Sequence, residues 1–295
     1  MNGCADEHIY EETTDALDYD LIRQAVIGQI QFGPARSLAQ EMNPSYSVTE
    51  VSKLQTQIRE GMRVLDEFGN IELGLDDNET DIISRSRLGG ILTGVELLWV
   101  SDLIHVLSRA RISIVGLDND LPILCGTTSS IPDLSSLISH IQSSIGIRGE
   151  IIDGATVALG QIRKQIKSAY EDLLESLEHI LITKGNADIL QDQVISTRAG
   201  RLVLQVKTEF RNRFKGVVHG ASNTGATLYI EPLATVEKGN VWKQLVLEEE
   251  REKDRILKRL SSIVSESANE ILKGIDLTSQ FDFVLAKARY CTEMG

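Results

Sequence analysis

The sequence predicts a mainly α-helical protein with a helical core, two long antiparallel helices, and a small antiparallel β element inserted between those helices. Over most of the 295 residues, apolar side chains recur at intervals of three and four, which is typical of amphipathic helices. From Arg198 to Pro232 this periodicity gives way to short runs of β-branched and aromatic residues, separated by Gly216, Gly220 and Gly225. Such runs are typical of strands joined by tight turns, so we expect a small sheet in this stretch.

We expect residues 1–152 to form the helical core. Apolar residues recur with helical spacing over 10–33 and again over 48–68, each time followed by a turn signal. The stretch 85–113 is apolar over a wide face, which indicates one buried helix. A shorter amphipathic helix is expected over 131–145.

Two long helices, here called the lever helices, are expected on either side of the β element. The ascending helix, within 153–197, should begin at Asp153, whose side chain can cap exposed N–H groups. Its narrow apolar stripe suits one partner helix and consists of Leu159, Ile162, Ile166, Ala169, Leu173, Leu177 and Ile180. The descending helix, within 233–274, has the same spacing, and residues 275–295 should return to the core. A charged stretch, 248–255, interrupts the descending stripe with charges of both signs at i,i+3 and i,i+4 spacing, so we expect it to be solvated, rich in salt bridges and locally weak.

The β element, residues 198–232, carries a local excess of positive charge, although the chain has a formal net charge of -13. One acid, Glu209, lies among the basic residues Arg198, Arg201, Lys207, Arg211, Arg213 and Lys215. A basic element on an acidic protein indicates a polyanionic partner. The alternative is a solvated face that keeps a sheet edge from aggregating.

A run of small and hydroxyl-bearing residues, Gly220 to Gly225, follows these cations. Backbone N–H groups in such a run can approach an anion, and His219 can donate a hydrogen bond to a phosphate or to a turn carbonyl. A lone serine near a histidine is weak evidence for a nucleophile and its base, so His219 and Ser222 predict no catalytic site. No glycine in the chain is followed by lysine, so the Walker-type phosphate loop is absent.

Several other classes of protein are excluded. The acidic N-terminus has no apolar segment of a secretory signal, and no run of about 18 apolar residues could span a membrane. Cys4, Cys125 and Cys291 are too scattered for a disulfide framework or a zinc site. The acidic stretch 70–81 should form a solvated loop, because its segment DDNETD, residues 76–81, lacks the glycine and the distal glutamate spacing of a calcium loop. We therefore expect a cytoplasmic protein that binds no metal and contacts no membrane.

The string VVHGASNTGATLYIEP resembles the MutS family, specifically its second bacterial branch, which lacks the mismatch-reading domain. The basic element RAGR precedes this string, and a charged helix containing LVLEEEREKDRIL follows it. The matching positions are Val218, His219, Ser222, Gly225, Thr227, Leu228, Glu231 and Pro232. Gly220 stands where that branch usually has Asp, and Thr224 where it usually has Ser, so the turn lacks a carboxylate. The stretches GEIIDGATVALGQIRKQI and GGILTGVELLWVSDLI extend the resemblance over essentially the whole chain.

The resemblance implies the core, lever and clamp portion of a longer DNA repair or recombination-control protein that acts on mismatched or branched DNA. The family's ATPase domain would begin after Gly295 and its nuclease domain would lie further on, so ATP and magnesium are expected only there and no enzyme activity is expected here. Duplex or branched DNA would be gripped by Arg198, Arg201, Lys207, Arg211, Arg213, Lys215, His219, Ser222, Asn223, Thr224 and Gly225. Such contacts hold the backbone without reading sequence.

A second hypothesis treats the chain as a dimerisation and ribosome-binding or RNA-binding module of a ribosome-rescue MutS-type protein. The apolar stripe of the ascending helix would then serve an intermolecular coiled coil, because family members are homodimers. Both hypotheses require a basic β element, so the sequence alone does not separate DNA from ribosomal RNA as the polyanion.

Overall fold

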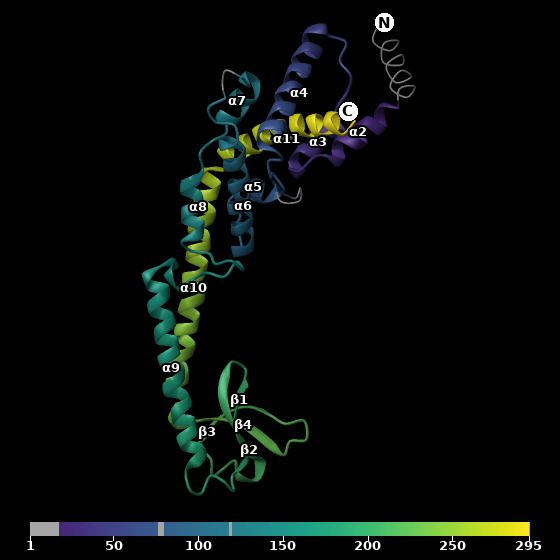
Figure 1. Cartoon of the computed structure of the whole chain (residues 1–295). Coiled ribbons are helices and arrows are strands. Elements are labelled where there is room, and N and C mark those ends of the chain that lie inside the picture. The colour runs from purple at the N-terminus through teal and green to yellow at the C-terminus, as the bar shows by residue number, and fades with distance from the viewer. Residues whose placement is uncertain (1–17, 76–79, 118–119, 295) are drawn as a thin grey trace. The chain divides into compact units, whose positions relative to one another are not determined.

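The computed structural model describes residues 18–75, 80–117 and 120–294. These residues form two compact units: one up to Glu150 together with the segment from Leu257 onward, and one comprising Ile151–Ile256. Within this part of the chain the protein is mainly helical, with one four-stranded antiparallel sheet, which confirms the predicted fold class (Figure 1). The acidic residues 76–79, within the stretch for which we expected a solvated loop, lie outside the described residues.

The first unit is built from helices packed around α11. Its helices are α2 (Tyr19–Gly28), α3 (Arg36–Gln40), α4 (Val48–Phe68), α5 (Thr80–Arg87), α6 (Gly94–Ile112), α7 (Pro122–Ser129), α8 (Ser135–Gln142) and α11 (Ala268–Met294). Helix α11 contacts α2 to α7, and its Phe281 and Leu285 are fully buried. Asp282, also fully buried, accepts hydrogen bonds from the backbone of Gln31 and Phe32 and pairs with Arg289. A buried carboxylate is tolerated here because each of its oxygens has a donor.

Two helix boundaries in the first unit differ from the prediction. The single helix expected over 85–113 is divided into α5 and α6, with Gly89 and Gly90 between them. Conversely, Gly274 does not end a helix but lies inside α11. A Cβ at Gly274 would stand 2.7 Å from Cδ1 of Leu107, so the glycine permits close packing of α11 against α6.

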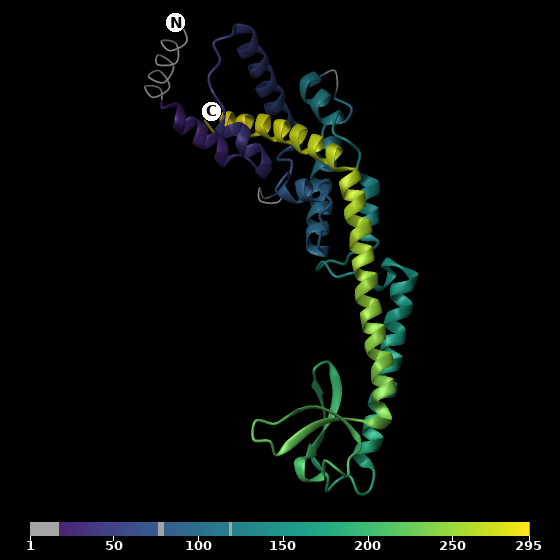
Figure 2. The same cartoon turned by 180° about the vertical axis from the view of Figure 1, so that it is seen from behind.

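The second unit contains α9 (Val157–Ile182), the sheet, and the first part of α10 (Val236–Glu266). In both views α9 runs alongside this part of α10, as expected for the lever helices (Figure 2). Helix α9 does not begin at Asp153 as predicted, because Thr156 is its N-cap and accepts a hydrogen bond from the Leu159 N–H at 3.0 Å.

The sheet has the strand order β1-β2-β4-β3. Its strands are β1 (Leu190–Arg198), β2 (Arg201–Lys207), β3 (Gly216–Ala221) and β4 (Thr227–Pro232). The sheet thus starts at Leu190, within the range that we had assigned to the ascending helix. Most of β1 is exposed, so polar residues occupy both of its faces. The strand therefore lacks the alternation of apolar and polar residues by which a strand is recognised in sequence.

One face of the sheet packs on the lever helices. Leu204, Val206 and Ile230 form a buried cluster with Leu173 and Leu177 of α9, and Trp242 of α10 packs against the same cluster. The sheet therefore shares one apolar core with both lever helices. None of the helices in the described ranges combines the length and the apolar character that crossing a membrane requires.

Candidate nucleic-acid interface

All the predicted contact residues lie on the sheet or its connections, but they fall into three environments. In strand β2, Leu202, Leu204 and Val206 pack on the lever helices. Arg201 and Lys207 alternate with these residues and therefore point away from that apolar core.

Arg201 and His219 are both bound to one buried carboxylate. The Glu231 side chain is 4% exposed; its Oε1 lies 3.3 Å from Nη1 of Arg201, and its Oε2 lies 2.7 Å from Nε2 of His219. Arg201 also donates to Oδ1 of Asn240 in α10 at 2.7 Å. Buried charges persist when they are paired, so this network attaches the sheet to α10 and compensates the charge of Arg201.

Two local features of the backbone make this network possible. The β3–β4 register shifts between Val218 and Gly220, so His219 is the extra residue of a β-bulge whose ring reaches Glu231. In α10, a Cβ at Gly239 would stand 2.7 Å from Oε1 of Glu231. Only glycine lets the helix backbone approach the ion pair this closely.

Arg198 and the β3–β4 turn form the second environment. The guanidinium carbon of Arg198 lies 4.3 Å from the ring centroid of Tyr229, and its Nη2 donates to the tyrosine hydroxyl at 3.0 Å. The two side chains border a surface hollow whose other wall is the turn segment 220–224. Stacking holds the guanidinium in place and leaves its charge uncompensated, because in the described part of the chain no carboxylate pairs with Arg198.

The turn itself presents backbone donors to this hollow. Ser222 and Thr227 form two hydrogen bonds with each other. The Ser222 N–H donates to the Thr227 carbonyl at 2.8 Å, and the Ser222 Oγ accepts from the Thr227 N–H at 3.1 Å. The N–H of Gly225 donates to the Ser222 carbonyl at 2.9 Å. Among the described residues, the N–H groups of Asn223 and Thr224 have no acceptor, and both residues are exposed. Adjacent free N–H groups are suited to binding an anion.

The connection between β2 and β3 is the third environment. Arg211 donates to the carbonyls of Phe214 and Gly216, at 3.3 Å and 3.5 Å, and so holds the connection in shape. Arg213 and Lys215 are exposed and lie beside a second hollow with Leu233. Lys207, at the start of the connection, donates to the Asp188 carbonyl at 3.0 Å. Carbonyl acceptors leave a full positive charge on each of these cations.

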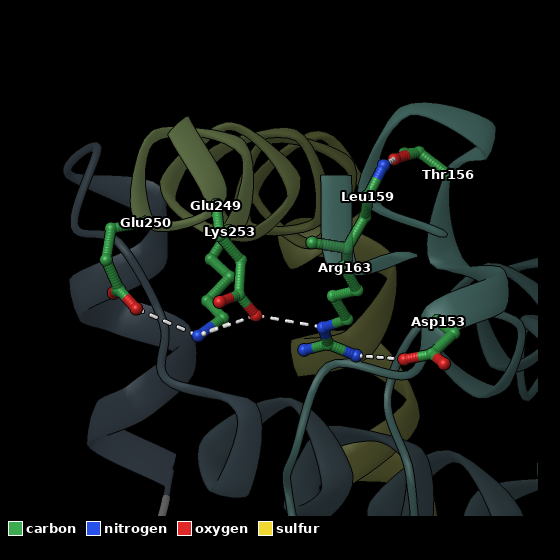
Figure 3. A network of polar contacts seen from close by, with 7 residues as sticks. All are labelled: Asp153, Thr156, Leu159, Arg163, Glu249, Glu250 and Lys253. Carbon is green, nitrogen blue, oxygen red and sulfur yellow. Dashed lines mark hydrogen bonds and ion pairs between the residues drawn. The ribbon is translucent and has the colours of Figure 1, made fainter. Parts of the chain in front are cut away.

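A second polar network lies between the lever helices (Figure 3). The charge spacing predicts its salt bridges within 248–255, but it does not predict the contacts with α9. Arg163 of α9 donates from Nε to Oε1 of Glu249 in α10 at 2.9 Å and also pairs with Asp153. Lys253 lies between Glu249 and Glu250, 3.1 Å and 2.8 Å from their oxygens. The expectation that residues 248–255 are solvated is therefore wrong for the residues that face α9.

Glu252 extends the same network and is more deeply buried. It is 6% exposed and accepts a hydrogen bond from the Thr156 hydroxyl, the N-cap of α9, at 2.9 Å. Burial is the largest single influence and works against the charged forms of Glu249 and Arg163. The hydrogen bonds and charges of their partners, including Lys253 and Asp153, together outweigh it, so the pKa of Glu249 is lowered and the pKa of Arg163 is raised. The charged stretch is thus an ionic contact between the lever helices.

No protein-family model matches this chain. Individual curated proteins do match it. It is 32% identical over 284 residues to "Endonuclease MutS2" of Shouchella clausii, which covers 95% of this chain and 36% of that protein. Proteins of the same name from Geobacillus sp. and Thermomicrobium roseum are 31% and 30% identical over 281 residues each, covering 94% of this chain and 36% and 35% of theirs.

These similarities confirm the resemblance to the second branch of the MutS family that the motif around the β3–β4 turn predicted. The chain spans about a third of the length of these relatives.

Proposed function

We propose that the sheet of the second unit holds the sugar-phosphate backbone of DNA without reading its sequence, as the clamp of a MutS-type protein that acts in DNA repair or recombination control. The relatives are named endonucleases, and the chain corresponds to about a third of their length. We infer that this portion holds DNA for chemistry that residues elsewhere in such a protein perform. The cofactors of that chemistry, ATP and magnesium, are assigned to those other residues.

The observation that carries this proposal is the set of uncompensated cations on the sheet and its connections. In the described ranges, no carboxylate pairs with Arg198, Lys207, Arg211, Arg213 or Lys215, whereas Arg201 is paired. The formal net charge of the chain is -13, so an unneutralised basic surface here is not a consequence of overall composition. Phosphates are the partner that such cations bind without sequence preference.

The residues of the three environments have different roles in the proposed binding. Arg198, Arg213 and Lys215 are exposed and meet phosphates directly, while the N–H groups of Asn223 and Thr224 add uncharged hydrogen bonds. Arg211 shapes the connection that presents Arg213 and Lys215. Arg201 and His219 act through Glu231 by attaching the sheet to α10.

The proposal is tested by reversing two exposed cations that no carboxylate among the described residues pairs with, Arg213 and Lys215. Arg213 also lies over the ring of Phe210, with its guanidinium carbon 5.5 Å from the ring centroid. The double substitution Arg213→Glu and Lys215→Glu should weaken binding of a 30-base-pair duplex by at least about a hundredfold at low salt, because it replaces two phosphate contacts by two repulsions. The matched control reverses Lys164 and Lys258, two exposed lysines outside the sheet, and has the same net charge. Equal loss of affinity in both variants would show that only overall charge matters and would contradict the proposal.

Ribosomal RNA presents the same phosphates, so its separation from DNA requires a comparison of the two polyanions at matched salt. We expect the wild-type chain to bind duplex or branched DNA more tightly than ribosomes at matched salt. Preference for ribosomes by orders of magnitude would favour the alternative, an RNA-binding and dimerisation module.

A further inference from the structure

A pocket in the first unit places a lysine amine against apolar side chains. The pocket lies between the end of α3, helix α4 and helix α11. Its apolar wall includes Met42, Leu54, Ile58 and Phe283, and Lys287 lines it from α11. This pocket is separate from the sheet and takes no part in the function proposed above.

The charge of Lys287 has no carboxylate partner among the described residues. Its Nζ lies 4.1 Å from the ring centroid of Phe283, one turn earlier on the same helix. The titratable groups around the pocket are Glu41, which is exposed at the end of α3, Tyr19 of α2, and Cys291 on α11 itself. Arg23 of α2 donates to the Met42 carbonyl at 3.2 Å, and its charge is compensated by Asp20, 2.6 Å away.

Burial works against the ammonium form of Lys287, whereas the ring of Phe283 attracts it. Burial lowers the pKa of Lys287 from 10.5 to about 8, and the weak opposing effect of Cys291 does not restore it. At pH 7.5 roughly a quarter of the amines would be neutral, against about one in a thousand for an ordinary lysine. A neutral amine that remains accessible through a pocket is a nucleophile.

We infer that Lys287 is a site of covalent acylation, at which its amine takes a short acyl group from a thioester. The neutral amine attacks the carbonyl carbon, a C–N bond forms, the C–S bond breaks, and the sulfur leaves as thiolate. The ammonium proton lost from nitrogen passes to water. The amide product is uncharged, so acylation removes the unfavourable burial of a positive charge, and the apolar wall accommodates the acyl chain.

The test uses the whole 295-residue chain and the acetyl thioester of N-acetylcysteamine as the probe. Acetylation of each lysine is followed by mass spectrometry of peptides at several pH values. Lys287 should react at least about tenfold faster at pH 7.5 than the exposed Lys164 and Lys258, and its rate should level off above a midpoint near pH 8. Lys287→Arg should remove the fast-reacting peptide and leave the other peptides unchanged.

A second variant tests whether Lys287 reacts fast because of its apolar environment or only because its amine is exposed. Ile58→Glu places a carboxylate in the pocket wall from α4, which should raise the pKa of Lys287, slow its acetylation several-fold at pH 7.5, and restore the rate at pH 10. A Lys287 that reacts no faster than Lys164, or whose rate climbs through pH 10 as theirs does, would overturn the inference.

Discussion

Arg163 and Glu249 join the two lever helices through a hydrogen-bonded ion pair, with Nε and Oε1 2.9 Å apart and side chains only 26% and 16% exposed. Exposed ion pairs contribute little to stability, but removing one partner of a pair that is mostly shielded from water leaves the other without compensation. This relationship makes the charged stretch of α10 a specific contact, and it leads to two predictions about stability.

The substitution Glu249→Ala should lower the free energy of unfolding of the second unit by about 1–3 kcal/mol, because it leaves Arg163 and Lys253 without their shared acceptor. Unfolding in urea can be followed by the fluorescence of Trp242 in a Trp99→Phe background, since the chain has two tryptophans and Trp242 lies in the second unit. Glu171→Ala is the control, because its pair with Lys167 is exposed and 4.0 Å long. Equal effects of the two substitutions would contradict the role of this contact.

The same pair makes stability depend on pH in the acidic range. The pKa of Glu249 is lowered from 4.5, so its contribution is present above that pH and is lost as the pH falls through the lower, folded-state pKa. The second unit should therefore lose stability as the pH falls below about 4.5, and Glu249→Gln should show a smaller loss over the same range. Urea titrations of both proteins at pH 7, 4.5 and 3 measure this. A Gln variant that loses as much as the wild type would assign the effect to other carboxylates.

Glu231 should be more important for the sheet than its position in a basic segment suggests. Glu231→Ala removes the acceptor of both Arg201 and His219, and Arg201 is only 18% exposed. We expect the free energy of unfolding to fall by about 3–5 kcal/mol, as for other broken buried pairs. The exposed Glu209→Ala serves as the control and should change stability by less than about 0.5 kcal/mol. Hydrogen exchange of β4 measures whether the sheet is the part that loosens.

Gly220 offers a test of the hollow beside Arg198. A Cβ at this position would meet only Cδ2 of Tyr229, at 3.9 Å, so there is room for a side chain. The φ of +156° strains any residue other than glycine, and substitutions by Asp and by Asn carry that strain equally. Gly220→Asp, the residue that the family resemblance leads one to expect, would place a carboxylate near Arg198 and should weaken duplex binding about five- to tenfold. Gly220→Asn has the same shape without the charge and should bind nearly as the wild type does. Similar losses in both variants would indicate backbone strain instead of charge.

The sequence predicted those features that depend on local pattern. Helical periodicity identified α4 and α9, and the glycine-separated apolar runs identified β2, β3 and β4. It missed β1, because a mostly exposed strand has no alternating pattern, and it placed a helix end at Gly274, where the glycine serves packing against Leu107.

The candidate site shows the same division. The cations Arg213 and Lys215 are exposed on the sheet connection, as a local charge pattern suggests. That Arg201 and His219 are bound to Glu231 depends on the strand register and on a β-bulge, which join residues 30 and 12 positions apart. Within α10, Glu249 pairs with Lys253 and Glu252 pairs with Arg255 at the i,i+4 and i,i+3 spacings that the sequence shows. Their partners across the lever helices, Arg163 of α9 and its N-cap Thr156, lie 86 and 96 positions away. Pairing across such distances is a property of the fold and leaves no spacing signal in the sequence.

The salt dependence of duplex binding tests the central claim most directly. The affinity of the wild-type chain for two 30-base-pair duplexes of unrelated sequence should be equal and should fall linearly on a logarithmic salt scale, because binding releases counterions from phosphates. Replacing Arg198, Arg213 and Lys215 by alanine should reduce the magnitude of that slope by about one for each phosphate contact removed. A slope that is unchanged in the triple variant, with binding retained, would show that the sheet does not hold the DNA backbone.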